Sequence, residues 1–245
     1  MDQSVFKSNF ELLLKQQVDT VPRFEQTQTQ FLPLLNDDSH KTDFDPHYIY
    51  HTAWAARRLR LGTAIEHVDF ASSLYFVSIA SAIVPIRFFD YRPAPLIFDG
   101  VQAGQANLTS LPFESNSLPS VSCMHVVEHI GLGRYGDPVD YDGDIKAMTE
   151  LARVVTIGGS LLFVVPVGLS RIVYNAHRIY SYQQIRQSFG GIFSLENFAL
   201  ITDRGEFLPQ AKEGETETQI YGCGCFHLVK QRTVTAPDAP FLQGW

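Results

Sequence analysis

The sequence predicts an α/β fold in which a mostly parallel, twisted sheet carries helices on both faces. The segment from Ser120 to Gly168 is the first observation, because it reads as strand, glycine-rich loop, amphipathic helix, Gly-Gly turn and strand. Its last strand, Ser160 to Val165, is almost wholly apolar, as expected for a parallel strand covered on both faces. The second observation is that strand and helix patterns alternate from about residue 64 to about residue 200. Such sheets bind ligands beyond the carboxyl ends of their strands, so we expect the site there.

Composition limits the class of protein. The chain has 245 residues, of which 45% are hydrophobic and 18% charged, enough to bury a core as one large domain. Its net charge of -7 argues against nucleic acid as a partner. Three cysteines give no even disulfide framework and predict a reducing, cytoplasmic location. Because no apolar run reaches membrane-spanning length and the first residues are polar, we expect neither a membrane partner nor secretion.

The pattern along the chain predicts three parts. Residues 1–60 are expected to form an N-terminal helical extension that caps the core, with one helix over residues 4–17, a polar stretch over 18–44, and a second helix that starts with Asp45 as N-cap and Pro46 in its first turn. On that second helix Tyr48, His51 and Trp54 fall on one side. Residues 61–232 are the expected α/β domain, and residues 233–245 the C-terminal tail.

A βαβ unit between Ile65 and Asp90 indicates a cofactor site. We expect a strand ending at Asp69, a tight turn of small residues over 71–73, a helix over 74–84, and a second strand that ends at Asp90. Asp90 lies 21 positions after Asp69, and dinucleotide-type folds place an acidic residue about 20 positions on, where it accepts hydrogen bonds from ribose hydroxyls. The alternative is an ordinary βαβ unit whose aspartates only form turns.

His125, Glu128 and His129 form the sharpest local cluster. The spacing H-x-x-E-H is that of a class of zinc metalloproteases, in which two histidines on one helix face bind the ion, but His125 is expected at the end of a strand. One of these histidines near its neutral pKa could instead remove a proton from a substrate. A structural alternative remains, in which Glu128 and His129 only cap and orient the helix that follows.

Several segments, taken in order, resemble a known superfamily. DFASS from Asp69, Asp90 after a strand, ANLTSLPFESNS, SVSCMHVVEH and RVVTIGGSLLFVVPV resemble the motifs of class I S-adenosylmethionine-dependent methyltransferases. SSLYFVS, MHVVEHIGLGRYGDP and YGCG more closely resemble an uncharacterised methyltransferase-like family known as a domain of unknown function. The resemblance covers roughly residues 45–230 and implies a Rossmann-like fold with S-adenosylmethionine as cofactor.

The resemblance also implies roles for the residues that match its motifs. The methionine part of the cofactor would face Asp69, Ala71, Ser72 and Ser73, the ribose would face Asp90, and the adenine amino group would face the side-chain oxygen of Asn107. His125 also counts among the residues facing the cofactor. Where relatives have alternating glycines, this chain has Ala71, Ser73 and Tyr75, whose side chains narrow the expected site.

The expected chemistry is O-methylation of a sugar or another polar small molecule. His125 or His129, with Glu128, would remove the hydroxyl proton, and a similar Glu-x-x-Glu-His motif of some ubiquinone-pathway methyltransferases implies a possible divalent metal ion. Candidate substrate-binding residues are Arg134, Tyr135, Arg171, Tyr174 and His177.

Two other interpretations stay open. One is a catalytically inactive binding or regulatory module on the same fold, which filling of the cofactor pocket by Phe70 or Tyr75 would favour. The other is a metal-dependent hydrolase that uses His125 and His129. Cys223, Cys225 and His227 alternate along a predicted strand, and we interpret them as core residues rather than a zinc knuckle.

Overall fold

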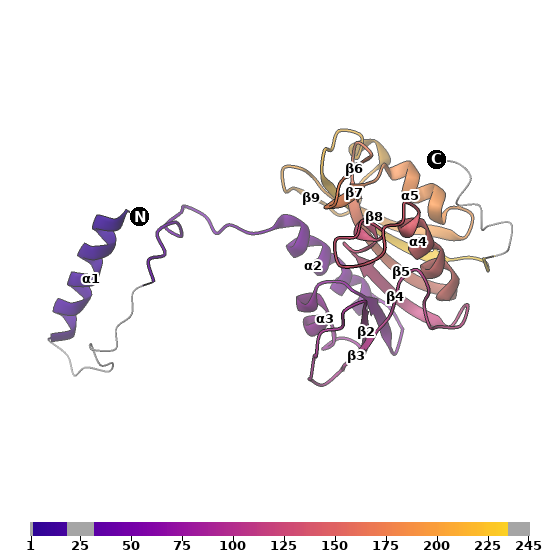
Figure 1. Ribbon diagram of the computed structural model, residues 1–245, viewed down its shortest axis with the longest axis horizontal. Coiled ribbons are helices and arrows are strands. Elements are labelled where there is room, and N and C mark those ends of the chain that lie inside the picture. Colours follow the sequence, from indigo (N-terminus) through magenta and orange to yellow (C-terminus); the bar gives the residue numbers. More distant parts are fainter. Residues whose placement is uncertain (1, 19–31, 235–245) are drawn as a thin grey trace. The chain divides into compact units, whose positions relative to one another are not determined.

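The computed structural model describes residues 2–18 and 32–234, and it divides the chain into a unit of residues 1–44 and a unit of residues 45–245 (Figure 1). The first unit contains helix α1 (Gln3–Val18), which confirms the helix expected over residues 4–17. Asp2 caps this helix, because its Oδ1 atom accepts hydrogen bonds from the backbone N–H groups of Ser4 and Val5. The expected packing of this segment on the core stays a prediction.

The second unit begins with helix α2 (Pro46–Leu61), as the Asp45-Pro46 pair predicts. The Asp45 carboxylate accepts a hydrogen bond from the backbone N–H of Tyr48 at 3.2 Å. The buried Trp54 donates a hydrogen bond from Nε1 to Oδ1 of Asn197, at 2.9 Å, on a strand of the sheet. α2 is therefore part of the same unit as the sheet, although the sequence analysis assigned it to the N-terminal extension.

In the described part of the chain, the central sheet has eight strands in the order β3-β2-β1-β4-β5-β10-β8-β9. The first five in this order are mutually parallel, and β10 lies antiparallel between β5 and β8. Their bounds are β1 (His67–Phe70), β2 (Ile86–Asp90), β3 (Val101–Gln105), β4 (Leu118–Met124), β5 (Val155–Val167), β8 (Phe193–Ile201), β9 (Phe207–Leu208) and β10 (Gly222–Lys230). The predicted mostly parallel sheet is confirmed.

The connections between strands are short helices and one hairpin. They are α3 (Leu74–Ala80), the 3-10 turn η2 (Val127–His129), α4 (Gly143–Val154), the hairpin of β6 (Arg171–Val173) and β7 (His177–Ile179), α5 (Tyr182–Phe189), and the 3-10 turn η3 (Glu213–Glu215). α3 ends at Ala80, earlier than the expected residue 84. Ser181 caps α5 through a capping box with Gln184. Among the described residues, no helix combines the length and apolar composition needed to cross a membrane.

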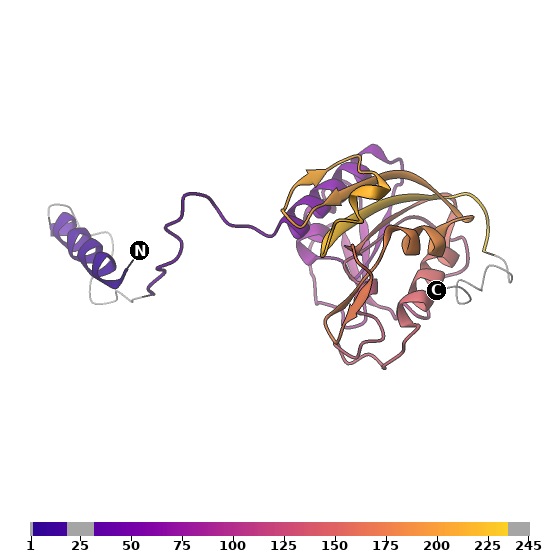
Figure 2. The same ribbon diagram turned by 90° about the horizontal axis from the view of Figure 1, so that it is seen from above.

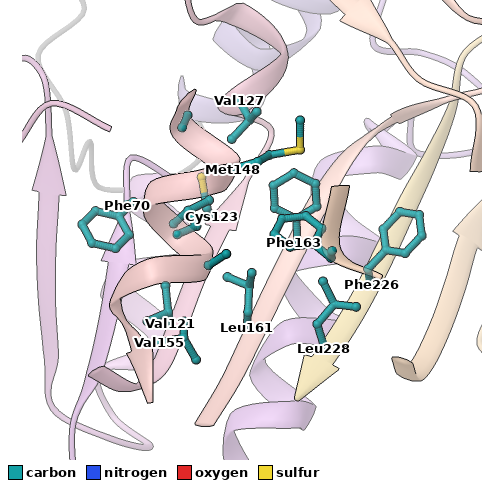
Figure 3. Packing of buried hydrophobic residues seen from close by; sticks show 14 of the residues in the cluster. Phe70, Val121, Cys123, Val127, Met148, Val155, Leu161, Phe163, Phe226 and Leu228 are labelled. Atoms are coloured by element: carbon teal, nitrogen blue, oxygen red, sulfur yellow. The ribbon is translucent and has the colours of Figure 1, made fainter. Parts of the chain in front are cut away.

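Alternate residues of β5 face two separate halves of the core. Leu161 and Phe163 pack with residues of α4 and α5 in the cluster that Figure 3 shows. Leu162 and Val164 pack on the opposite side with residues of α2 and α3. All four side chains are at most 1% exposed, so β5 is covered on both faces and its apolar run is explained. The helices on the two faces can be followed in Figure 2.

The order of the strands reverses between β1 and β4. From β1 the chain proceeds outward to β2 and β3, whereas from β4 it proceeds the other way to β5. The loops that leave the carboxyl ends of β1 and β4 therefore turn away from each other and leave a crevice between them. This is the part of the fold that positions the site.

A buried lysine joins the end of β10 to the end of α4. Lys230 is 1% exposed, and its Nζ atom donates hydrogen bonds to the carbonyl oxygens of Ala152 at 2.5 Å and Val155 at 2.7 Å and to Oδ1 of Asn116 at 2.8 Å. A cation at this position satisfies carbonyl groups that the end of a helix leaves without a partner.

We expect Lys230→Met to lower the free energy of unfolding by about 3 kcal/mol, because each acceptor that stays buried without a partner costs about 1–3 kcal/mol. Lys146→Met is the control, since it removes only a surface ion pair with Asp140 and is expected to cost less than about 1 kcal/mol. Urea denaturation of both variants measures the difference. Equal stability of the two variants would contradict the role of Lys230.

Candidate active site

A cavity of about 380 Å³ opens at the carboxyl ends of β1, β2 and β4. This volume is within the range of about 300–1,000 Å³ that is usual for small-molecule sites. Of the residues predicted from the sequence, the cavity wall contains Ala71, Ser72, Ser73, Asp90, Asn107, His125, His129 and Tyr135. The sequence and the fold therefore point to the same edge of the sheet.

The turn after β1 keeps the cavity open despite its lack of glycine. Ala71 has φ of 56°, in the left-handed region that glycine usually occupies, and its N–H donates to the carbonyl of Phe89 at 2.8 Å. Tyr75 is 84% exposed and is not part of the cavity wall. Phe70 contributes to the wall but is packed against Phe89 and is 1% exposed. The side chains that replace the expected glycines thus do not fill this site.

Asp69 lies beneath the turn rather than in the cavity wall. Its side chain is fully buried, and Oδ1 accepts a hydrogen bond from the backbone N–H of Ser72 at 3.0 Å. The hydroxyl of Ser122 donates to the other carboxylate oxygen. Asp69 is not part of the cavity wall, and its carboxylate accepts hydrogen bonds that hold the turn, while Ala71 to Ser73 line the cavity; a contact between Asp69 and a cofactor stays a prediction.

A chain of hydrogen bonds continues from Asp69 through β4. His67 lies with Nε2 2.8 Å from the hydroxyl of Ser122 and with Nδ1 2.8 Å from the hydroxyl of Ser120. Because Ser122 donates to Asp69, it accepts from Nε2 of His67, and Nδ1 of His67 accepts from Ser120. Burial lowers the pKa of His67 to about 3 and raises the pKa of Asp69 to about 6.

Two predicted contacts lie at the opposite side of the cavity. Asp90 ends β2, and its Oδ1 accepts a hydrogen bond from the backbone N–H of Arg92 at 2.8 Å. Oδ1 of Asn107 accepts from both the backbone N–H and the hydroxyl of Thr109, at 3.0 and 2.9 Å. The side-chain oxygen of Asn107 and one carboxylate oxygen of Asp90 are thus engaged in their own turns, and both residues line the cavity; their contacts with a cofactor stay predictions.

His125 follows β4 in a left-handed conformation, with φ of 57°. It precedes η2 rather than lying in a helix, so His125 and His129 do not share a helix face as in the H-x-x-E-H proteases. Its Nδ1 is 2.9 Å from Oε1 of Glu128. A non-glycine residue in this conformation is typical of a site whose surroundings hold it in place.

Glu128 is a buried carboxyl group between two imidazoles. It is 1% exposed, and its Oε1 atom is 3.8 Å from Nε2 of His129. Burial raises the pKa of Glu128 to about 7. Within the described chain, Oε2 of Glu128 is buried without a hydrogen-bond partner. Nδ1 of His129 donates to the carbonyl of Ala176 at 2.6 Å, and burial lowers the pKa of His129, so its neutral ring leaves Nε2 as an acceptor.

The sequence analysis missed the aromatic rings that surround His125. His47 and Tyr48 of α2 stack on it with ring centroids 5.7 and 5.6 Å away, and His51 meets it edge-on at 5.1 Å. Cys223 of β10, expected only as a core residue, places Sγ 3.3 Å from Nε2 of His125. The available signal was the spacing of His47 and His51, which are four residues apart on a predicted helix.

Tyr135 is the only one of the predicted substrate residues in the described cavity wall. Two guanidinium groups lie over its ring, that of Arg92 4.8 Å and that of Arg134 5.1 Å from the ring centroid. Arg134 itself donates a hydrogen bond from Nη1 to the carbonyl of Ala176 at 3.0 Å. It ties the glycine-rich loop to the hairpin that contains β7.

The other predicted substrate residues lie outside the cavity wall. Arg171 donates to the carbonyl oxygens of Leu169 and Ile220, at 2.8 and 3.0 Å, because these groups border its strand. Tyr174 is 75% exposed on the hairpin turn. His177 packs against Tyr221, with ring centroids 4.8 Å apart, and its ring is 6.4 Å from that of His129. Only His177 lies close enough to influence the site through a neighbouring ring.

Comparison with known proteins supports the fold. A sequence profile of a family described as a Caenorhabditis protein of unknown function, DUF268, matches residues 113–215. No curated protein matches the chain. Many solved structures do, and the chain has the Rossmann-like fold of class I methyltransferases.

Three solved structures illustrate the likeness. The protein bound to the Trm112 methyltransferase activator of Haloferax volcanii has a TM-score of 0.54 at 17% identity, covering 78% of this chain and 92% of its own. The N-methyltransferase NodS of Bradyrhizobium japonicum WM9, in complex with S-adenosylhomocysteine, has a TM-score of 0.53 at 9% identity, and the match covers 77% of this chain and 89% of NodS. The 1,6-didemethyltoxoflavin-N1-methyltransferase of Burkholderia thailandensis has a TM-score of 0.51 at 10% identity, and the match covers 75% of this chain and 79% of that enzyme.

We expect His67 to make stability fall on acidification. Its pKa is about 3 in the folded chain and about 6.5 when unfolded, so between these values the unfolded chain binds more protons and stability decreases as the pH falls. His67→Gln should reduce the slope of unfolding free energy against pH by up to about 1.4 kcal/mol per unit in this window. Urea denaturation between pH 7 and pH 4 measures it. The opposite contribution of Asp69 is present in both proteins, and equal slopes would refute the assignment.

Proposed function

We propose that this chain is an S-adenosylmethionine-dependent methyltransferase that acts on a polar small molecule, with O-methylation of a sugar or a related hydroxyl compound as the reaction. The observation that carries the proposal is the open cavity at the switch point of a class I methyltransferase fold, with the Asp90 carboxylate in its wall. Two of the structurally similar proteins have S-adenosylhomocysteine bound.

The residues present fit the cofactor. Asp90 provides carboxylate oxygens for ribose hydroxyls, and the backbone and hydroxyl groups of Ala71 to Ser73 provide small, polar surroundings for its methionine part. When bound, S-adenosylmethionine supplies a methyl group on a positively charged sulfur. The oxygen of Asn107 is available to the adenine only if Thr109 releases it, so this contact contributes less to affinity than Asp90.

His129 is the better candidate for the base. Both ring nitrogens of His125 already have neighbours, Oε1 of Glu128 and Sγ of Cys223. His129 lies in the cavity wall, and its bond from Nδ1 to a backbone carbonyl fixes the tautomer in which Nε2 accepts a proton. A substrate hydroxyl beside Nε2 would lose its proton there as its oxygen takes the methyl group.

The wall around His129 suits a polar acceptor. Tyr135, Arg92 and Asp137 contribute a ring, a cation and an anion to the same cavity. Aromatic rings stack on the faces of sugars, while the charged groups hydrogen-bond hydroxyls. Arg134, Arg171, Tyr174 and His177 are outside the wall, so we assign them no direct contact with the substrate.

Calorimetric titration of the chain with S-adenosylmethionine and S-adenosylhomocysteine tests the proposal. We expect Asp90→Ala to weaken binding at least about tenfold, because hydrogen bonds to a charged group are worth about 1.5–3 kcal/mol. Asp99→Ala is the matched control, since Asp99 is exposed and outside the cavity wall and should bind like wild type. Absence of binding to either ligand by the folded wild type would exclude the cofactor and leave a non-catalytic binding module.

Substitution of His129 tests the base. With methyl-labelled S-adenosylmethionine and a panel of sugars and hydroxylated metabolites, we expect His129→Gln to keep cofactor affinity and to lower kcat by about 10²–10⁴-fold, the usual contribution of a positioned base. His40→Gln, an exposed histidine of the other unit, is the control. Unchanged turnover in His129→Gln would assign proton removal to another group.

A further inference from the structure

Three metal-ligating side chains from distant parts of the chain meet beside the cavity. His47 of α2, His125 after β4 and Cys223 of β10 each offer one donor atom, and these atoms all lie within 4.8 Å of one another. Nε2 of His125 and Sγ of Cys223 are 3.3 Å apart. The fold therefore brings together two imidazoles and one thiol.

This donor set is that of a zinc site. Zinc binds histidine nitrogen at about 2.0–2.1 Å and thiolate sulfur at about 2.3 Å in tetrahedral geometry, so neighbouring donors lie roughly 3.3–3.7 Å apart. The His125–Cys223 pair already has that separation. His47 is half-buried at the start of α2, and its donor atom lies within 4.8 Å of the other two, so only a small approach of its ring would complete the set.

A second observation is the carboxylate behind His125. Nδ1 of His125 is 2.9 Å from Oε1 of Glu128, which fixes the tautomer with a free Nε2 lone pair directed at Cys223. Metal-bound histidines usually donate their other N–H group to such a carboxylate. Oε2 of the buried Glu128 has no hydrogen-bond partner in the described part of the chain.

We propose that His47, His125 and Cys223 bind one zinc ion, with Glu128 as the residue that orients His125. Binding displaces the thiol proton of Cys223, which leaves as a free proton while sulfur bonds to the ion. Three protein ligands leave a fourth position for water or for an oxygen or nitrogen atom of a ligand. Because His125 also belongs to the cavity wall, the ion lies at its edge.

Two arrangements of the same residues are less well supported. In an H-x-x-E-H site His129 would be a ligand, but its Nδ1 is bonded to a backbone carbonyl and it is not one of the three clustered donors. The second arrangement is a catalytic triad, with Cys223 as a thiol nucleophile, His125 as its base and Glu128 as the acid that orients the base. Cys223 is fully buried and outside the cavity wall, so no substrate carbon can reach its sulfur there.

Equilibrium dialysis of the chelator-treated full chain against zinc, followed by metal analysis, tests the site. We expect one ion per chain, and with cobalt in place of zinc we expect a thiolate-to-metal charge-transfer absorption. His47→Ala and Cys223→Ser should each weaken zinc binding more than about 100-fold, and Glu128→Gln about tenfold, in line with the effects of outer partners. Circular dichroism of each variant confirms that it folds.

Matched controls separate the alternatives. Cys123→Ser changes an equally buried thiol outside the cluster, and it should keep both zinc affinity and the cobalt absorption. His129→Gln should keep zinc under this proposal and lose it under the H-x-x-E-H arrangement. A folded wild type that binds no zinc, or zinc binding that survives His47→Ala and Cys223→Ser, overturns the proposal. Titration with S-adenosylmethionine is a separate measurement, so failure of one assignment leaves the other intact.

Discussion

A buried carboxylate under the turn after β1 is the constraint on which the site depends. Asp69 lies where β1 and β4 diverge, and it holds the backbone of Ser72 while accepting from Ser122. A charge in such a place is costly unless hydrogen bonds compensate it, and the chain through His67 extends those bonds into β4. The same bonds therefore join the two strands and shape the cavity wall. These bonds help to hold Ala71 in its left-handed conformation, which is unfavourable for a residue other than glycine.

The surroundings of His125 bring together parts of the chain that local structure keeps apart. α2, which precedes the first strand in the sequence, contributes aromatic rings, and η2 contributes a carboxyl group and an imidazole. β10 contributes a thiol. Similar proteins share the sheet at 9–17% identity, so the fold is common to chains with very different side chains. What this protein does at the site depends on these added groups more than on the sheet, because a shared fold does not fix a shared chemistry.

Local signals in the sequence were enough to predict the sheet and the start of α2, since the apolar run of β5 and the Asp45-Pro46 pair depend only on neighbouring residues. They also placed Asp90 in the cavity wall. The direction of a polar side chain could not be predicted in the same way. The resemblance assigns Asp69 and Asn107 to the cofactor, yet a side-chain oxygen of each accepts a hydrogen bond that exists only once the backbone is folded. Contacts across distant segments, such as those of His47, have no local signal of comparable strength.

The position of β10 also determines when the sheet can close during folding. β10 lies between β5 and β8, so until residues 222–230 are in place both of those strands present an unpaired edge. A ribosome releases β8 well before β10, and a partly made chain therefore exposes two apolar strand edges that invite pairing with other chains. Cys223 and Lys230 both belong to β10, so the sulfur beside His125 and the lysine at the end of α4 are positioned only when this strand pairs. Until β10 pairs, the sheet is open although residues 70–143 of the cavity wall have already been synthesised, and in this interval the chain is exposed to aggregation.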